Sequence, residues 1–434
     1  MPMQMMDVFE EHFSEAAFLR FQWERALLAP NYSLAETAEL EERLLAHLDG
    51  LMLGGESVSE VLLKAALEGE EPGEVFCAAF VSIAGSPPAA LEAVLALAPA
   101  APAAVQAALR RALELHGHAE LNAHLVPLLR APEVPVQALA LEVLAFRGAV
   151  PRGTALELLG HADGRVVTAA LRSLGALSRD VARQELPRLL GDKRPNVRMA
   201  AIEAGLLSGM RVAWDACRHE AQGSGEGAPV ARVLQAICGD DKDAKRLVAL
   251  AADEGGRTDV LWALGFTGRA AVAEVCLELM GQESPVARLA GEAFGAITGL
   301  VVEGAYAMEL EEDSLPPLDE DDLDVDLVPG AEDVLQVPVR AAVANWWQRA
   351  RQDFSRSTRY LDGKPFSGAV LLEALTRGGM RRRQVHAQEL ALRTQGTHRV
   401  QTLSFTARQR AELARAASSC ERLPVRPLAL EFGG

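Results

Sequence analysis

A unit of about 30 residues recurs through the middle of this chain and restricts its fold more than any other feature. Four segments align: LRAPEVPVQALALEVLA, LGHADGRVVTAALRSLG, LGDKRPNVRMAAIEAGL and MGQESPVARLAGEAFG, which end at Ala145, Gly175, Leu207 and Gly295. Each contains a polar turn and then a Val that is followed by small or apolar residues four, five and eight places later. This spacing is one stripe of an α-helix. A second short apolar stretch precedes each turn, so each unit is predicted to be a helix pair.

Weaker copies extend the series to about eight units. Their first stripe positions are 26 to 33 residues apart: Phe76, Val105, Val136, Val166, Val197, Val230, Gly256 and Val286. Pro135, Pro195, Pro229 and Pro285 precede stripes, where proline suits the first turn of a helix. The predicted fold is all-α, an α-solenoid of helix pairs over residues 61–300. The alternative is an irregular helical globule.

The units resemble HEAT repeats of the short bacterial kind, and LGHADGRVVTAALRSLG is the best example. The resemblance covers Val75 to Gly299 and implies a right-handed curved stack of helix pairs, without implying any chemistry. Three further segments resemble an uncharacterised proteobacterial and myxobacterial HEAT-repeat family: FSEAAFLRFQWERALLAPNYSLAETAELEERLLAHLDGL, WWQRARQDFSRSTRYLDGKPF and RRRQVHAQELALR. Members of that family are often associated with type VI secretion gene clusters. The resemblance implies an accessory, adaptor or effector-linked scaffold.

The N-terminal residues 1–60 do not follow the repeat and are predicted to form a helical cap. One helix there is crowded with aromatic residues, namely Phe9, Phe13, Phe18, Phe21 and Trp23. The end of a solenoid needs a covering element, because its last unit otherwise exposes a core face. A docking surface is the alternative interpretation of these aromatic residues.

Residues 301–337 are predicted to form an acidic linker. Between Glu303 and Asp333 the chain has 13 acidic residues and no Lys or Arg, and runs of like charge repel each other and stay extended. Two alternatives remain open. One is an acidic docking motif built on Leu315, Leu318, Leu323, Val325 and Leu327. The other is a calcium loop at Asp322, Asp324 and Asp326, which lacks the Gly and Glu that such a loop requires.

The sign of the charge reverses in the last hundred residues. Residues 335–434 contain 17 Lys and Arg against 7 acidic residues. Residues 338–434 are therefore predicted to form a basic helical region, a diverged terminal repeat that docks on acidic repeat or linker surface. A partner-binding patch is predicted from residue types that dominate interfaces: Trp346, Trp347, Arg381, Arg382 and Arg383. One alternative is that the Trp side chains pack the cap while the Arg side chains lie in solvent or pair with the acidic linker. The other is a patch that binds nucleic acid.

The sequence shows no catalytic motif, and neither catalytic residues, a metal site nor a cofactor is predicted. His116, His118 and His124 form the densest histidine cluster, but Gly117 interrupts it and no metal-ligand spacing follows. The five cysteines contain no CxxC pair, which indicates a reducing compartment. The start of the chain lacks the basic and apolar regions of a signal peptide, and no span for a membrane is found, so a cytoplasmic location is predicted.

The predicted function is that of a non-catalytic protein–protein interaction scaffold or adaptor whose partner is another protein. A net charge of −17 opposes the alternative of a nucleic-acid-binding HEAT solenoid, because such proteins gain affinity by neutralising phosphates. A lyase or modifying enzyme is a further alternative that rests on fold analogy alone.

Overall fold

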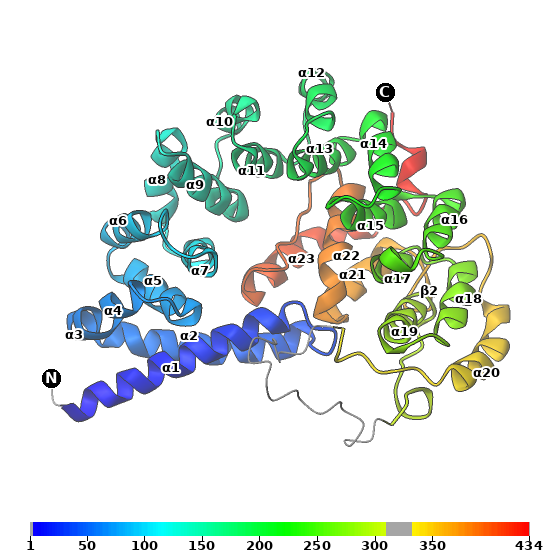
Figure 1. Ribbon diagram of the computed structural model, residues 1–434, viewed down its shortest axis with the longest axis horizontal. Coiled ribbons are helices and arrows are strands. Elements are labelled where there is room, and N and C mark those ends of the chain that lie inside the picture. The colour runs from blue at the N-terminus through cyan, green and yellow to red at the C-terminus, as the bar shows by residue number, and fades with distance from the viewer. Residues whose placement is uncertain (1–2, 310–331, 434) are drawn as a thin grey trace. The chain divides into compact units, whose positions relative to one another are not determined.

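A computed structural model shows that the chain is almost wholly helical (Figure 1) and describes residues 3–309 and 332–433. Helices account for 71% of it, which confirms the all-α solenoid class. The predicted docking motif at Leu315–Leu327 and the alternating Asp322, Asp324 and Asp326 lie outside the described residues. None of the helices in the described ranges has the length and apolar character that crossing a membrane requires.

By its contacts the chain forms two compact units, which combine segments from more than one of the ranges expected from sequence. Unit 1 comprises Met1–Leu28, Tyr32–Ala204 and Val400–Glu412, and unit 2 comprises Ala29–Asn31, Gly205–Arg399 and Leu413–Gly434.

Unit 1 starts with two long helices that pack against each other, α1 (Met3–Ala26) and α2 (Leu34–Leu53). A helical stretch in three pieces follows: α3 (Gly55–Val58), the π-helix η1 (Ser59–Leu63) and α4 (Lys64–Leu67). The repeat helices are α5 (Pro72–Gly85), α6 (Pro87–Leu97), α7 (Ala103–Leu115), α8 (Leu121–Leu125) with 3₁₀ helix η2 (Val126–Arg130), α9 (Val134–Arg147), α10 (Arg152–Glu157) with 3₁₀ helix η3 (Leu158–Gly160), α11 (Gly164–Leu174), α12 (Arg179–Leu190) and α13 (Pro195–Leu207).

Two layers of helices build unit 1. The helices that carry the sequence stripes, α5, α7, α9 and α11, contact one another in chain order and form one layer. The intervening helices α6, α8, α10 and α12 lie on the other side of that layer (Figure 1). Each stripe supplies the buried face of its helix, as with Val166, Ala170 and Leu174 in α11. The predicted helix pair is therefore the building block of this unit.

The predicted helix starts are found, with differences in how they are capped. The Asp163 carboxylate caps α11 by accepting hydrogen bonds from the main-chain N–H groups of Arg165 (2.8 Å) and Val166 (3.4 Å). Glu133 and Glu283 occupy the same position before α9 and α19 but form no such bond, because their longer side chains do not turn back onto the helix end.

Unit 2 continues the alternation with α14 (Arg211–Ala221), α15 (Ala228–Cys238), α16 (Asp241–Leu250), the 3₁₀ helix η4 (Glu254–Gly256), α17 (Arg257–Leu264), α18 (Ala270–Leu279) and α19 (Ser284–Thr298). The stripe helices α15, α17 and α19 again contact in order. Two first stripe positions differ from the prediction. Gly256 lies in η4, before α17 begins. Val230 is 42% exposed, and Ala231 takes the buried place in α15. The first residue of that stripe is therefore one place later.

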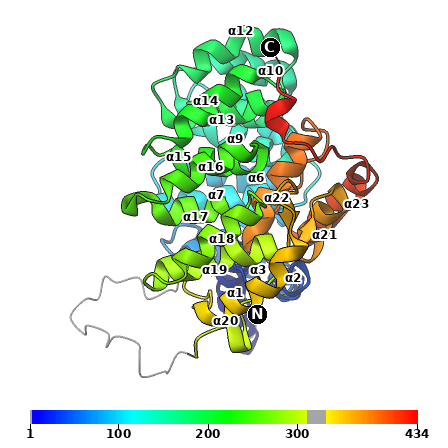
Figure 2. The same cartoon turned by 90° about the vertical axis from the view of Figure 1, so that its right-hand side faces the viewer.

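The basic C-terminal region is helical, as predicted. The 3₁₀ helix η5 (Gly304–Tyr306) precedes it. Its elements are α20 (Arg340–Ala350), the 3₁₀ helix η7 (Arg351–Asp353), α21 (Gly368–Arg377), α22 (Met380–Arg393), α23 (Thr406–Cys420) and the 3₁₀ helix η8 (Leu428–Leu430). Helix α20 lies against α18 (Figure 2), and α21 packs on α22.

The predicted turn in RYLDGKPF is a tight hairpin of two short antiparallel strands, β1 (Tyr360–Leu361) and β2 (Lys364–Pro365). Asp362 (φ 50°) and Gly363 (φ 75°) both adopt the left-handed backbone conformation that a two-residue Asp-Gly hairpin loop requires. Any side chain at position 363 would collide with the carbonyl oxygen of Thr298, 2.5 Å from the place of its Cβ. Glycine thus allows the hairpin to lie directly on the end of α19.

Candidate functional site

The two tryptophans predicted as partner contacts lie on α20 and pack mainly inward. Trp347 is only 5% exposed, and its ring lies 5.5 Å from Phe294 of α19 and 5.1 Å from Phe354, between centroids. Trp346 is half-buried and lies 6.1 Å from the same Phe294. These rings form the core between α20 and α19, so little of their surface faces a partner.

The three consecutive arginines are covered as well. Arg383 is fully buried, donates to the carbonyl oxygen of Leu375 (2.6 Å), and burial lowers its pKa to about 10. The Arg381 and Arg382 guanidiniums lie 3.3 and 3.7 Å from the Glu292 carboxylate, with side chains 10% and 14% exposed. Arg381 also pairs with Glu332 at 3.0 Å. The predicted docking on acidic repeat and linker residues is thus present within unit 2.

Aromatic rings complete this arginine cluster. Arg381 lies over the ring of Trp262 (4.6 Å) and Arg382 over that of Phe266 (3.9 Å), both on or next to α17. Stacking and ion pairing of this kind hold α22 against the repeat helices. The structure therefore brings Arg381 and Arg382 together with repeat residues, places Arg383 against α21, and places the two tryptophans in a separate contact.

A second surface, in unit 1, holds a segment of the chain itself. Residues 400–412 lie against helices α1, α2, α5, α7 and α9 of that unit, and we call them the returning segment. Glu41 of α2 accepts hydrogen bonds from the main-chain N–H (2.8 Å) and the hydroxyl (3.0 Å) of Thr406. Arg111 of α7 donates to the carbonyl oxygen of Leu403 and pairs with Glu24 at 2.7 Å. Side chains of α2 and α7 thus form hydrogen bonds with main-chain groups of the returning segment.

Aromatic side chains fill the space around these polar contacts. The Phe405 ring lies 5.1 Å from Trp23 and 6.3 Å from Phe80. The Arg111 guanidinium lies 5.3 Å from the ring of Trp23 and 5.3 Å from that of Phe146. Arg408 donates to the carbonyl oxygen of Phe146 at 3.0 Å. The half-buried Phe405 ring of the returning segment therefore packs against rings from α1 and α5.

Burial controls the ionisation of the groups at this surface. It raises the pKa of the Glu41 carboxyl, against hydrogen bonds from Thr406 that lower it. It lowers the pKa of His116 to about 4, with smaller contributions from the neighbouring His118 and Arg147. His116, Arg147, Phe405 and Arg408 line a cavity of about 340 Å³ beside the returning segment. None of these groups is arranged as a nucleophile with a base.

Sequence reasoning did not identify this surface. Arg111 is 8% exposed, and a charged residue inside the apolar stripe Ala108, Leu109 and Ala112 was the one available signal. No pattern in residues 400–412 indicated where they pack, because the contact spans 365 positions between Glu41 and Thr406.

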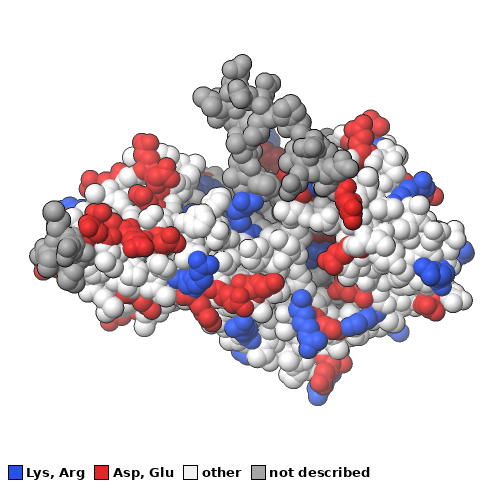
Figure 3. Space-filling model, turned by 90° about the horizontal axis from the view of Figure 1, so that it is seen from below, with Lys and Arg blue, Asp and Glu red and all other residues white. Residues whose placement is uncertain are grey.

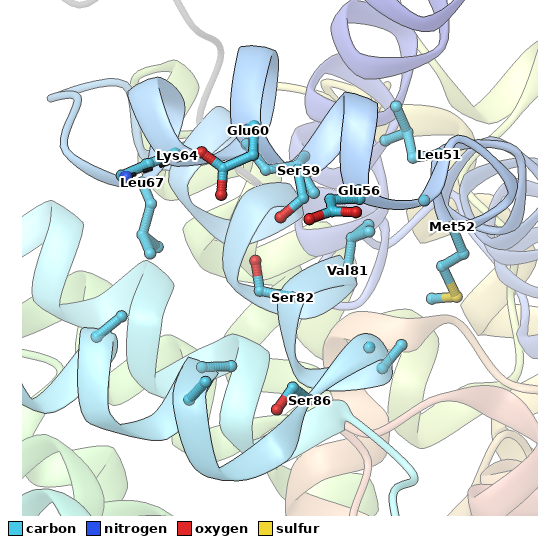
Figure 4. A pocket seen from close by; sticks show the side chains of 17 residues that line it. Leu51, Met52, Glu56, Ser59, Glu60, Lys64, Leu67, Val81, Ser82 and Ser86 are labelled. Atoms are coloured by element: carbon cyan, nitrogen blue, oxygen red, sulfur yellow. Dashed lines mark ion pairs between the residues drawn. The ribbon is translucent and has the colours of Figure 1, made fainter.

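A third feature of unit 1 is an open groove between residues 51–67 and helices α5 and α6 (Figure 4). Its volume is about 670 Å³, and its floor is apolar, with Leu51, Leu63 and Val81. Glu56, Ser59 and Glu60 lie on the η1 side and Ser82 on the α5 side. A weak, exposed ion pair of 3.9 Å joins Glu60 and Lys64.

The protein belongs to the class of all-α helical solenoids. No family model matches the chain, and the search of curated proteins gives no match. Among solved structures the chain is similar to an engineered protein whose crystal structure was determined by the Northeast Structural Genomics Consortium. The two share 17% identity over 64% of this chain and 87% of that chain, with a TM-score of 0.30. A similarity of this size supports no conclusion about function.

Proposed function

We propose that this chain is a non-catalytic scaffold that binds another polypeptide on the α5–α7–α9 layer of unit 1. The observation that carries the proposal is the returning segment, since the layer already holds a stretch of polypeptide through its main chain. Helical-repeat surfaces commonly bind extended partners in this way. The returning segment covers the binding surface until a partner replaces it.

The contacts indicate what a partner segment needs. Arg111 and Glu41 recognise a carbonyl oxygen and an N–H group, which every polypeptide offers. The rings of Trp23 and Phe80 favour an aromatic side chain that packs against both, as Phe405 does. We therefore expect a partner segment with an aromatic residue directly before a helix start.

The resemblance to HEAT-repeat proteins of secretion clusters supports a narrower version of the proposal. In that version the chain acts in the cytoplasm as an accessory or adaptor of type VI secretion, and its partner is a secretion component or effector. The net charge of −17 disfavours nucleic acid as the partner.

A pull-down with three full-length variants tests the proposal. Phe405→Ala loosens the returning segment but leaves the layer intact, so it should increase the recovery of partner proteins from native lysate. Arg111→Ala removes a group of the layer and should decrease it. Arg110→Ala is the matched control, because the neighbouring Arg110 pairs with Glu142 (3.1 Å) and forms no contact with residue 403. Partners are identified by mass spectrometry, and cross-links locate them.

Cross-links to α7 and α9 together with opposite effects of the first two variants would support the proposal. Equal recovery with Arg111→Ala and Arg110→Ala would contradict it. If the protein retained only nucleic acid or a small molecule, a nucleic-acid-binding role or an enzymatic role would be favoured over the scaffold.

A further inference from the structure

The groove between residues 51–67 and helices α5 and α6 is lined mainly by apolar and small side chains (Figure 4). Its volume of about 670 Å³ lies within the range of roughly 300–1,000 Å³ that is usual for binding sites. A Cβ built on Gly85 would meet no atom within 4 Å, so this side of the groove is open. Small residues line the side of α5 and α6 and leave room for the close approach of a partner: Ala84, Gly85, Ala89, Ala90 and Ala93.

The groove offers little to the main chain of a partner. Six polar side chains line it: Glu56, Ser59, Glu60, Lys64, Ser82 and Ser86. An extended segment would bury N–H and C=O groups against the apolar floor without partners, which is costly. An α-helix pairs these groups within itself, and amphipathic helices bind apolar grooves in this way. The groove therefore favours a helix, whereas Glu41 and Arg111 bind the main chain of the returning segment.

The wall formed by α3, η1 and α4 indicates how long such a helix is. These three elements contain 4, 5 and 4 residues, so the wall extends over about 20 Å, or almost four turns of an α-helix. In η1 the N–H of Lys64 donates to the carbonyl oxygen of Ser59, five residues earlier. Such π-helical turns occur frequently at functional sites.

The surroundings of the groove are strongly acidic. Residues 49–92 contain eight acidic residues and one basic residue, Lys64, which is paired with Glu60 at 3.9 Å. All of these acidic residues except Glu74 are exposed. Acidic side chains predominate at the left of the molecule in Figure 3, the side on which Figure 1 places α3 and α4. Such a surface attracts a cationic partner and repels an acidic one, a second copy of this chain included.

We propose that this groove binds a cationic amphipathic α-helix of another protein. Large apolar side chains on one face of that helix fill the floor, and Lys or Arg side chains beside that face meet Glu56 and Glu60. This site is additional to the surface that holds the returning segment. Helix α5 contributes Val81 and Ser82 to the groove, whereas its Phe80 contacts the returning segment.

Fluorescence anisotropy with designed peptides and the full-length protein tests the proposal. The probe is a labelled peptide of Leu and Lys, about 18 residues long, with Leu on one face of its helix. One control peptide has the same composition in an order that forms no such face, and a second has Glu in place of Lys. One helix buries less than the roughly 1,600 Å² of a standard interface, so we expect a dissociation constant in the micromolar range. Both control peptides should bind at least about tenfold more weakly.

Two variants of α6 locate the probe. Ala89→Trp brings a large ring into the groove from an exposed position, so it should weaken binding about tenfold or more. Ala96→Trp is the matched control, because Ala96 is exposed on the same helix but does not line the groove. Circular dichroism checks that each variant is folded. Equal binding by the two variants would overturn the proposal, because the peptide would then lie elsewhere.

Two double variants separate the local charge of the groove from the net charge of the protein. Glu56→Lys/Glu60→Lys should weaken binding of the probe about tenfold. Glu39→Lys/Glu42→Lys makes the same charge change at exposed positions of α2 outside the groove and should have little effect. Equal losses in both would overturn the proposal, as would equal binding of the peptide that forms no apolar face. These outcomes are independent of the test of the proposed function, which depends on other residues.

Discussion

The Glu41 carboxylate accepts hydrogen bonds from both the main-chain N–H and the hydroxyl of Thr406, at 2.8 and 3.0 Å, across 365 positions of sequence. Thr406 is the first residue of α23, so a side chain from α2 caps the start of a helix near the other end of the chain. A carboxylate in this place satisfies otherwise unpaired N–H groups and faces the positive end of the helix dipole. This contact fixes where the returning segment enters unit 1.

Replacement of this carboxylate should loosen the returning segment. Glu41→Ala leaves the N–H of Thr406 buried without an acceptor, and we expect a loss of about 1–3 kcal/mol in the free energy of unfolding. Chemical denaturation measures the loss, and hydrogen exchange of residues 400–412 locates it. Glu42→Ala, at the neighbouring exposed position, should change neither quantity. Unchanged exchange in Glu41→Ala would show that the aromatic contacts alone hold the segment.

The sequence predicted the repeat helices because their signal is local. Val166, Ala170 and Leu174 lie on one side of α11 whatever the rest of the chain does, so their spacing reveals the buried face. The partner of Glu41 has no such signal. One carboxylate among 60 acidic residues looks the same whether it caps a distant helix or faces water.

The candidate site residues show the limit of reasoning from residue type. Trp346, Trp347 and the three arginines were selected because such side chains dominate interfaces. The structure uses the same aromatic and cationic contacts inside unit 2, for example Arg382 over Phe266. Arg383 falls on the buried stripe with Ala387 and Leu390, and that spacing was the available sign of its burial.

The packing of α20 predicts different roles for its adjacent tryptophans. Trp347 is buried against Phe294 and Phe354, so Trp347→Ala should lower the free energy of unfolding by about 3–5 kcal/mol. Trp346→Ala is the matched variant, and because this side chain is half-buried its effect should be clearly smaller. Thermal or denaturant unfolding of both variants gives the comparison. Equal losses would mean that the two rings contribute alike to the core.

A buried ion triad in unit 2 should be essential for stability. The Glu389 carboxylate, with a side chain 1% exposed, is bound by the guanidiniums of Arg359 (2.9 Å) and Arg393 (2.8 Å). Burial opposes the ionisation of Glu389, but the two arginines outweigh it and lower its pKa to about 2. Glu389→Gln leaves two buried cations uncompensated and should lower the free energy of unfolding by about 3–5 kcal/mol.

The exposed pair of Lys364 and Glu373 provides the control for this triad. Its charged atoms are 2.7 Å apart but lie in solvent, so Glu373→Gln should leave the unfolding midpoint almost unchanged. Denaturant titrations of both variants at pH 7 make the comparison. A Glu389→Gln variant as stable as the control would show that the triad is replaceable.

Two buried histidines predict how stability changes between pH 7 and pH 5. Burial lowers the pKa of His386 to about 3 and that of His116 to about 4, while in the unfolded chain both stay near 6.5. As the pH falls below 6.5, the unfolded chain therefore binds protons that the folded chain does not bind. The contribution of each histidine to the free energy of unfolding is fully present above pH 6.5. Below that pH it decreases by about 1.4 kcal/mol per pH unit.

The variant His386→Gln separates this effect from the other titrations. It removes one proton-binding group, so the difference in the free energy of unfolding between pH 7 and pH 5 should be smaller than in the wild type. Glu389 does not contribute in this range, because its stabilisation is lost only as the pH falls from the usual glutamate pKa toward 2. His219→Gln, at an exposed position, should leave the difference as it is in the wild type. If His386→Gln shows the full pH dependence, His386 takes up its proton in the folded chain as readily as in the unfolded one.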